Sequence, residues 1–537
     1  MKQAILFLLF TFGSALGQTE DAWVYFTDKP NSQAFFDNPL SELSQRSLDR
    51  RGTQNITLDS KDAPLHQPYV NQISAATGIT VLAKSKWLNA LHVRGTVVNI
   101  AALENLAFVN RIQYANHSRN PGGRIASDVG KEAKVNKWLD IQENFAYGSS
   151  ATQVQMLNCH ILHEQSHTGE GKIVAIMDAG FPGVNTALPF KRLRDNGLIL
   201  GGYDFVNNST NFYTGNSHGT NVLSTMGGYA TNLVGTAPDA QYYLFITEDV
   251  SREEPLELSN WVEAAEEADR LGVDVINTSL GYFSFDNPAY SYTHAKMNGQ
   301  ISVASRAVDI AFSRGMICVT SAGNEGSTAE PHVGTPADAL HSVTVGSVTS
   351  SEVKSGFSSI GPTGDGRIKP DVMAMGTAAV ISTTSGTITT ADGTSFSGPI
   401  IAGAITSFWS AFPNKTNAQI VQLVKSSADR YASPNNNYGY GIPDFQLALN
   451  TALSSEEFEF GKIKMYPNPV KDILILDLPE QLLGAKLLIY NAFGQKIKEE
   501  LISVKNHKIS MHNLNSGVYF YTILNSGPSA SGKLIKQ

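Results

Sequence analysis

Three short motifs carry residue types that together can activate a serine for nucleophilic attack. Asp178 follows the apolar run KIVAIM, His218 opens a helical stretch in SHGT, and Ser395 lies in GTSFSGP before another helical stretch. A serine hydroxyl is a weak nucleophile that needs a neighbouring base, and the base needs a carboxylate to orient it. Aspartate, histidine and serine, in this order along the chain, therefore predict a catalytic triad.

A fourth residue supplies a donor for the negative charge that such a reaction develops. Asn324, in TSAGNEG, carries a side-chain amide that can donate a hydrogen bond to an oxyanion. Ser395 itself opens a predicted helix, where main-chain N–H groups are free to point at negative charge. We therefore expect Asn324 and the N–H of Ser395 to form an oxyanion hole.

These residues lie in a segment, residues 143–455, whose pattern predicts a mostly parallel α/β sheet. Apolar runs such as KIVAIMD, VDVINTSLG and MICVTSAGN alternate with helical stretches such as LSNWVEAAEEADRLG. Runs that are apolar on both faces and separated by helices are typical of a parallel sheet with helices on both faces. Sites in such sheets gather beyond the carboxyl ends of the strands, and Asp178, Ser279 and Asn324 each lie at such an end.

Residues 145–455 resemble a subtilase, a subtilisin-like serine protease, in several separate blocks. The blocks GTAPDA, FSSIGP, KPDVMAMG and YGYGIPDFQLAL add to the three motifs. The resemblance implies a serine endopeptidase in which Asp178 orients, His218 is the general base and Ser395 is the nucleophile that forms an acyl-enzyme. It also implies a substrate-binding strand and a wall of the P1 pocket, formed by Ser279, Leu280, Gly281, Ala322 and Gly323.

Departures from the family pattern bear on cofactors. Asn221 follows HGT where relatives often have a second histidine, and the loop between His218 and Ala237 is short and carries no carboxylate. We therefore expect no calcium loop of the family type there, and no metal site is predicted. The chemistry itself needs no cofactor, and a structural calcium ion elsewhere is left open, because oxygen ligands from scattered loops leave no sequence pattern.

Other residues of metal-binding type are expected to be structural. His160, His163 and His167 have spacings of three and four residues, which would align them on a helix. We expect them at an exposed helix end, because no carboxylate partner is evident beside them. Cys318 lies in an apolar strand and Cys159 in a helical stretch, so both thiols are expected to be structural.

The segments before the catalytic region indicate a leader, a small domain and a linker. Residues 1–17 combine Lys2, an apolar run and small residues at the end, as in a secretory signal peptide. Residues 18–115 predict a small α/β domain that resembles the inhibitory propeptide of subtilases, mostly by its position; an unrelated domain is the alternative. Residues 116–142 are polar and charged, so they predict a linker in which processing occurs.

The last segment, residues 462–537, predicts a small β-sandwich. Its short strands are broken by proline, asparagine and glycine, and no helical period appears. YPNPV, IYNAFGQKI and LNSGVYFYTI closely resemble the C-terminal sorting domain of cargo for type IX secretion. The resemblance implies export to the cell surface or medium and a secretion machinery as a partner. A carbohydrate- or surface-binding sandwich is the alternative.

Composition limits the function classes. The 537 residues carry a net charge of −8 and 42% hydrophobic residues, which fits a folded multidomain protein and argues against a dedicated nucleic-acid binder. Two cysteines cannot form a disulfide scaffold, and no apolar stretch after the N-terminus is long enough for a transmembrane segment. The expected partners are protein substrates and the chain's own propeptide. The alternatives are a catalytically silent binding protein with a protease fold, and a serine esterase or amidase.

Overall fold

The computed structural model describes residues 19–120, 145–460, 464–478, 483–491, 494–524 and 530–537. The expected signal peptide, residues 1–17, and residues 121–142 of the expected linker lie outside the described residues. The chain divides into two compact units, and the described part of the first ends at Gln446 while that of the second begins at Leu447.

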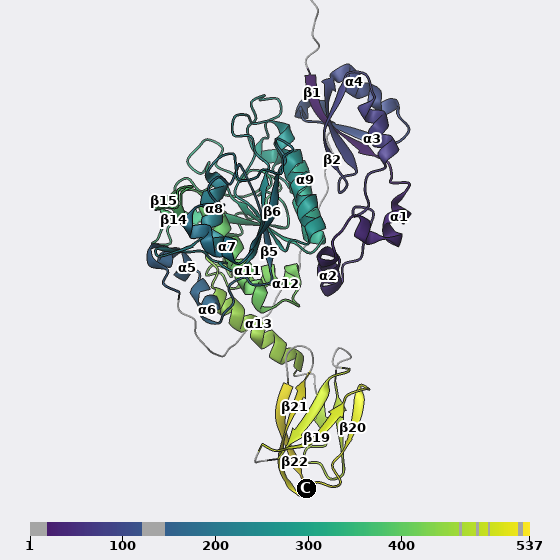
Figure 1. Ribbon diagram of the computed structural model, residues 1–537, viewed down its shortest axis with the longest axis vertical. Coiled ribbons are helices and arrows are strands. Elements are labelled where there is room, and N and C mark those ends of the chain that lie inside the picture. Colours follow the sequence, from purple (N-terminus) through teal and green to yellow (C-terminus); the bar gives the residue numbers. More distant parts are fainter. Residues whose placement is uncertain (1–18, 121–144, 461–463, 479–482, 492–493, 525–529) are drawn as a thin grey trace, which may run out of the picture. The chain divides into compact units, whose positions relative to one another are not determined.

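A seven-stranded sheet forms the centre of the first unit, and every neighbouring pair of its strands is parallel (Figure 1). In spatial order the strands are β13 (Val372–Met375), β12 (Ser342–Val348), β11 (Ile317–Ser321), β10 (Val275–Thr278), β5 (Ile173–Asp178), β9 (Gln241–Ile246) and β6 (Ile199–Asp204). The four strands β5, β10, β11 and β12 are buried along their whole length, which confirms the predicted parallel sheet with both faces covered.

Helices cover both faces of this sheet. One core cluster joins α9 (Pro255–Leu271) and α10 (Val303–Ser313) to alternate residues of β5, namely Ile173, Ala175 and Met177. The helices α8 (His218–Gly227) and α11 (Thr394–Ala411) pack against each other, and α11 also contacts β10 to β13. Since successive strand residues point to opposite faces, the buried Val174 and Ile176 face away from α9 and α10.

The helices of residues 145–460 are short except for α9, α11 and α13, and none of the described helices has the length and apolar character to cross a bilayer. They are α5 (Ala151–Gln155), α6 (Cys159–Glu164), α7 (Lys191–Asp195), α8 (His218–Gly227), α9 (Pro255–Leu271), α10 (Val303–Ser313), α11 (Thr394–Ala411), α12 (Asn417–Ser426) and α13 (Phe445–Phe460). Two small hairpins, β7 (Tyr229–Ala230) with β8 (Leu233–Val234) and β14 (Ala379–Ser382) with β15 (Ile388–Ala391), complete this part.

The N-terminal segment folds into a four-stranded antiparallel sheet with the order β2-β3-β1-β4. Its strands are β1 (Thr19–Phe26), β2 (Ile79–Ser85), β3 (Ala90–Thr96) and β4 (Val109–Tyr114), and its helices are α1 (Ser32–Asp37), α2 (Gln45–Thr53), α3 (Gln67–Ser74) and α4 (Val97–Ala102). Buried residues of β1, β3, α3 and α4 share one core. With α1 and α2 left aside, the order of strands and helices is that of a split βαβ fold, which agrees with the expected small α/β fold.

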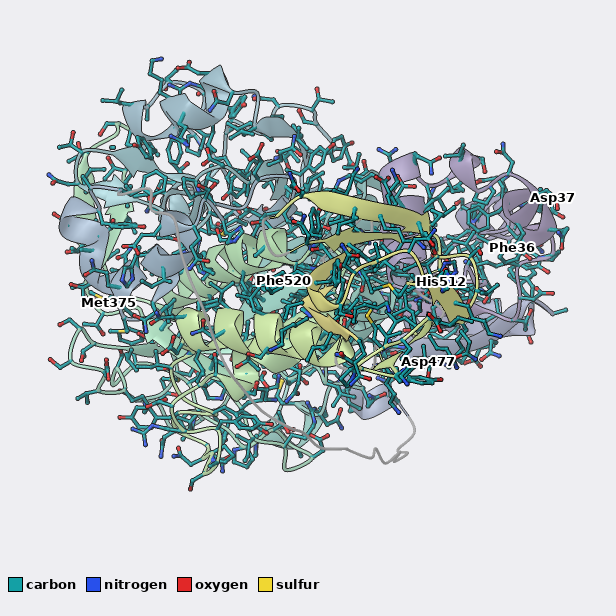
Figure 2. All side chains as sticks on the ribbon, turned by 90° about the horizontal axis from the view of Figure 1, so that it is seen from below. Phe36, Asp37, Met375, Asp477, His512 and Phe520 are labelled. Atoms are coloured by element: carbon teal, nitrogen blue, oxygen red, sulfur yellow. The ribbon has the colours of Figure 1, made fainter. Side chains whose placement is uncertain are left out.

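The second unit is a β-sandwich, in which two sheets pack on one apolar core. One sheet has the order β16-β17-β20 and the other β19-β18-β21-β22. These strands are β16 (Lys464–Tyr466), β17 (Ile473–Asp477), β18 (Lys486–Tyr490), β19 (Lys496–Leu501), β20 (Asn506–Ser510), β21 (Gly517–Leu524) and β22 (Ala530–Lys536). Both sheets contribute to a single apolar cluster. Phe520 of β21, labelled in Figure 2, lies outside this cluster and is 46% exposed.

Candidate active site

Asp178 ends β5 and is fully buried. Its Oδ1 accepts a hydrogen bond of 2.7 Å from the N–H of Ala179 and lies 2.8 Å from Nδ1 of His218. The other oxygen, Oδ2, is buried and makes no hydrogen bond within the described residues. The carboxylate is thus held in place by its own strand end and faces the imidazole.

His218 is the first residue of α8, and its main-chain N–H donates to Oδ1 of Asn216 over 2.9 Å. A side chain on the next residue, Gly219, would meet Cβ of Asp178 at 2.9 Å, so glycine is what allows α8 to approach β5 this closely. The negative charge of Asp178 raises the pKa of His218 against the opposing effect of burial. With Nδ1 donating to Asp178, Nε2 is the nitrogen left to accept a proton.

Ser395 is the second residue of α11, at the same carboxyl-end edge of the sheet. Its hydroxyl donates to the carbonyl of Ser279 over 3.1 Å, and no hydrogen bond joins it to His218 among the described residues. The ring of His218 instead lies 6.0 Å from that of Phe396, the residue after the serine. The sequence predicted that Asp178, His218 and Ser395 act together. It did not predict that the hydroxyl of Ser395 donates to the carbonyl of Ser279.

Asn324 follows β11 and is oriented by a residue that the sequence analysis missed. Its Oδ1 accepts from both the N–H (2.9 Å) and the hydroxyl (3.0 Å) of Thr394. Because these donors identify the oxygen, the NH₂ group points the other way, and Asn324 is exposed. Thr394 stands directly before Ser395, so its position in the GTS motif was the available signal.

The predicted substrate-binding residues line up beside this edge. Ser279 is buried, whereas Leu280 is half-buried and Gly281 is exposed. Within the described part of the chain, the main-chain groups of Leu280 and Gly281 make no hydrogen bond. The next residue, Tyr282, forms an antiparallel bridge with Thr335, which anchors the end of this segment. A segment with unpaired main-chain groups can pair with an extended peptide.

Ala322 and Gly323 form the turn between β11 and Asn324. The N–H of Ala322 donates to the carbonyl of Val345 over 2.9 Å. Gly323 has a φ of +104°, and a Cβ there would lie 2.5 Å from Oε2 of Glu325. This position therefore requires glycine, and the turn brings the asparagine side chain back toward Thr394.

The residues considered for metal binding have structural surroundings. Within the described residues, no group of three or more histidine, cysteine or acidic side chains could hold a metal. The expectation of an exposed helix end was wrong. His163 is buried between the hydroxyl of Tyr147 (2.8 Å) and the carbonyl of Thr236 (3.1 Å). Burial lowers its pKa to about 4. His160 and His167 are half-buried, and His167 lies beyond the end of α6. Both cysteines are free and buried, as expected.

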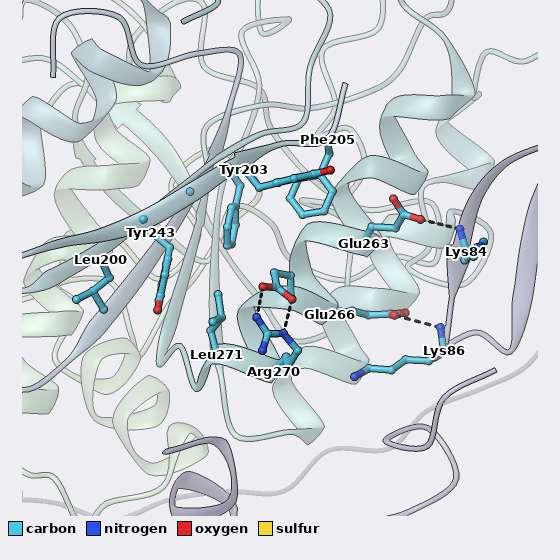
Figure 3. A pocket seen from close by; sticks show the side chains of 14 residues that line it. Lys84, Lys86, Leu200, Tyr203, Phe205, Tyr243, Glu263, Glu266, Arg270 and Leu271 are labelled. Atoms are coloured by element: carbon cyan, nitrogen blue, oxygen red, sulfur yellow. Dashed lines mark hydrogen bonds and ion pairs between the residues drawn. The ribbon is translucent and has the colours of Figure 1, made fainter. Parts of the chain in front are cut away.

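A cavity of about 720 Å³ lies elsewhere in the first unit (Figure 3). Aromatic side chains of β6 and β9, such as Tyr203 and Tyr243, form one side, and Glu263 and Glu266 of α9 form another. Lys84 and Lys86 of the N-terminal domain close it. None of the predicted site residues lines this cavity, so we place the candidate active site at the carboxyl-end edge of the sheet.

Comparison with known proteins identifies the family. The sequence profile of the subtilase family matches residues 169–441, which hold all of the candidate site residues. The chain belongs to the subtilase family. This subtilase is 32% identical to subtilisin NAT of Bacillus subtilis subsp. natto over 300 residues, which cover 55% of this chain and 70% of that protein. It is 26% identical to the serine protease AprX of Bacillus subtilis over 325 residues, covering 54% of this chain and 69% of that protein.

Two further profiles match the flanking segments of this subtilase. A peptidase S8 propeptide domain of Bacteroidota matches residues 21–132, and a secretion system C-terminal sorting domain matches residues 464–537. Among solved structures, the MycP3 protease from the type VII (ESX-3) secretion system aligns with a TM-score of 0.46 and 21% identity, over 58% of this chain and 90% of that one. The subtilase is thus a serine protease with a propeptide and a sorting domain that implies export.

Proposed function

We propose that this subtilase is an exported serine endopeptidase that cuts peptide bonds in proteins with Asp178, His218 and Ser395. The observation that carries the proposal is the 2.8 Å contact between the buried carboxylate of Asp178 and Nδ1 of His218. That contact fixes the imidazole in the form whose Nε2 can accept the proton of a serine hydroxyl. Ser395, at the N-terminus of α11, brings its hydroxyl to this edge of the sheet, within hydrogen-bond distance of the carbonyl of Ser279.

The proposed reaction follows from these positions. An extended peptide pairs with the free main-chain groups of Leu280 and Gly281, which places its scissile carbonyl at Ser395. The hydroxyl of Ser395 turns from the carbonyl of Ser279 to His218, loses its proton to Nε2 and attacks the carbonyl carbon. His218 then returns the proton to the leaving amine, and water resolves the acyl-enzyme by the same steps. These steps need no cofactor.

The oxyanion of the tetrahedral intermediate is stabilised by the NH₂ group of Asn324 and the N–H of Ser395. We expect Asn324→Ala to lower kcat by about 10²–10³-fold with little change in KM, because this donor acts on charge that develops only in the transition state. Steady-state kinetics on a peptide substrate measures both constants. Thr394→Val, which removes only one of the two bonds that orient Asn324, should give a smaller loss of kcat. A rise in KM at constant kcat would contradict the assignment.

The nucleophile can be tested directly with a fluorophosphonate probe, which reacts with an activated serine. We expect one label per processed protein, on the peptide that contains Ser395. We also expect the protein to hydrolyse casein, which a simple esterase would not do. Peptide mapping by mass spectrometry locates the label. A protein without any label would favour a silent binding protein with a protease fold. A labelled protein that cleaves small esters but not casein would favour an esterase or amidase.

A further inference from the structure

A segment of the propeptide reaches beyond its own sheet and binds the catalytic domain through buried arginines. This arginine arm, residues 38–63, lies between α1 and α3 and contains α2 (Figure 1). The N–H of Ser44, before α2, donates to the carbonyl of Arg270 at the end of α9 over 2.9 Å. Arg50 and Arg51, in the last turn of α2, are 6% and 2% exposed. Arginine is rarely buried to this degree unless its charge is paired.

The charge of this arginine pair is matched by Asp269, a fully buried residue near the end of α9. Arg51 donates to both oxygens of Asp269, over 2.9 and 2.8 Å, and Arg50 donates to Oδ1 as well. Within the described residues, the carboxylate of Asp269 accepts hydrogen bonds only from these two arginines. The neighbouring Asp274, in contrast, has a cation of the catalytic domain beside it, because Nζ of Lys172 lies 3.7 Å from its Oδ1. Asp269 is thus neutralised by the propeptide alone.

A second set of bonds crosses the interface with the opposite polarity. Arg314, which follows α10, is buried and donates to Asp62 over 2.8 Å and to Asp59 over 2.7 Å, both in the arginine arm. Asp62 also accepts from Arg51 over 2.6 Å. The arm and the enzyme therefore each insert arginine beside the other's aspartate. Removing one partner of such a buried pair leaves an uncompensated charge.

The arm also binds the carbonyl groups that the ends of α9 and α10 leave unpaired. Arg46 donates to the carbonyl of Gly272, and Arg50 donates to those of Val273 and Arg314, the latter over 3.1 Å. Gln54 donates to the carbonyl of Gly315 over 2.9 Å. The C-terminal end of a helix carries partial negative charge, so cationic donors are favoured there.

The propeptide has a separate contact with α9 that uses no arginine. Glu263 and Glu266 accept from the main-chain N–H groups of Lys84, Lys86 and Trp87, over 2.7, 3.1 and 2.9 Å. Figure 3 shows these glutamates facing the strand. Glu263 and Glu266 are half-buried, whereas the arginine pair and Asp269 are buried. Buried charge pairs are screened little by salt and cost more to break.

We propose that the face formed by Asp269, Arg314 and the ends of α9 and α10 is a docking site for a paired-arginine helix, and that its occupant is α2 of the chain's own propeptide. This contact, more than that of Glu263 and Glu266, determines how tightly the propeptide stays bound once the linker is cut. The inference rests on the proposed function only in that a protease must cut the linker. The chemistry of the occupant is a short helix with two consecutive arginines, backed by an aspartate that binds Arg314.

The test uses the full chain with Ser395→Ala, so that a released propeptide is not degraded by the enzyme. Brief trypsin treatment cuts the linker, an inhibitor stops the trypsin, and intact mass identifies the fragments. Gel filtration over a dilution series then gives the dissociation constant of the propeptide. We expect Arg50→Gln with Arg51→Gln to raise this constant by roughly 100-fold or more. Lys61→Gln, which removes a cation of the same arm whose side chain is 44% exposed, should leave it unchanged within a few-fold.

Two further variants keep the test decisive if the double variant does not fold. Arg51→Lys keeps the charge but loses the two-pronged bond to Asp269, and should weaken binding by an intermediate factor. In an Asp269→Asn background, Arg51→Lys should have much less effect, because the two residues act through one contact. Equal binding by the arginine variants and the parent would overturn the proposal, as would a larger loss with Glu266→Gln. Failure of self-processing in the wild type would count against the proposed function alone, because trypsin cuts the linker here.

Discussion

Ser395→Ala is expected to abolish both peptide hydrolysis and the chain's own processing while the fold is retained. The substitution removes the only atom that can form the acyl-enzyme, and in a working triad the loss in kcat is about 10⁶-fold. The side chain is small, and the hydrogen bond that its hydroxyl makes to the carbonyl of Ser279 is not part of the core. We therefore expect the melting temperature to change little.

Intact mass spectrometry of the expressed chain measures the processing. The wild type should lose more than about the first hundred residues, as the span of the propeptide profile indicates, and the new N-terminus marks the cleavage site. Ser395→Ala should stay uncut. Ser410→Ala is the matched control, since this serine lies in the same helix and, within the described part of the chain, its hydroxyl bonds only to the carbonyl of Ser407. This variant should process normally. Peptide hydrolysis by Ser395→Ala at the wild-type rate would rule out Ser395 as the nucleophile.

The parallel sheet and the edge that carries the candidate site could both be predicted from the sequence, because both follow from local patterns. Apolar runs such as that of β5, separated by helices, are typical of a parallel sheet covered on both faces, and chain direction then brings their carboxyl ends to one edge. Asp178, Ser279 and Asn324 could therefore be placed at that edge from the sequence. The order of the strands across the sheet could not, since no local pattern specifies it.

The contacts that the sequence did not reveal join residues far apart in the chain. Thr394 orients Asn324 across 70 positions, and Arg51 meets Asp269 across 218. SELSQRSLDRR predicted a charged helix, but nothing in it indicated that its arginines are buried, because burial of a charge depends on a partner elsewhere. His163 was misjudged for the same reason: its acceptor is a main-chain carbonyl, which any residue type supplies.

Asp178→Asn is expected to lower kcat by about 10⁴-fold without loss of the fold. An amide at this position can donate to the imidazole, which favours the tautomer with the proton on Nε2, and that nitrogen can then no longer accept the proton of Ser395. The buried Oδ2 of Asp178 makes no hydrogen bond within the described residues, so the substitution should break few other contacts. Steady-state kinetics and thermal unfolding separate the two effects.

The pH profile of activity gives a second test of Asp178. If the residue were merely structural, its replacement would not move the midpoint of this profile. The charge of Asp178 raises the pKa of His218, and a general base works only when unprotonated, so wild-type activity should rise with pH through a midpoint above 6.5. Without that charge, burial dominates and the midpoint should move to lower pH. Asp204→Asn is the control: this buried aspartate ends the strand β6 but bonds to Asn207 rather than to a histidine. It should leave both kcat and the midpoint unchanged, and an upward shift of the midpoint in Asp178→Asn would contradict the role assigned to the carboxylate.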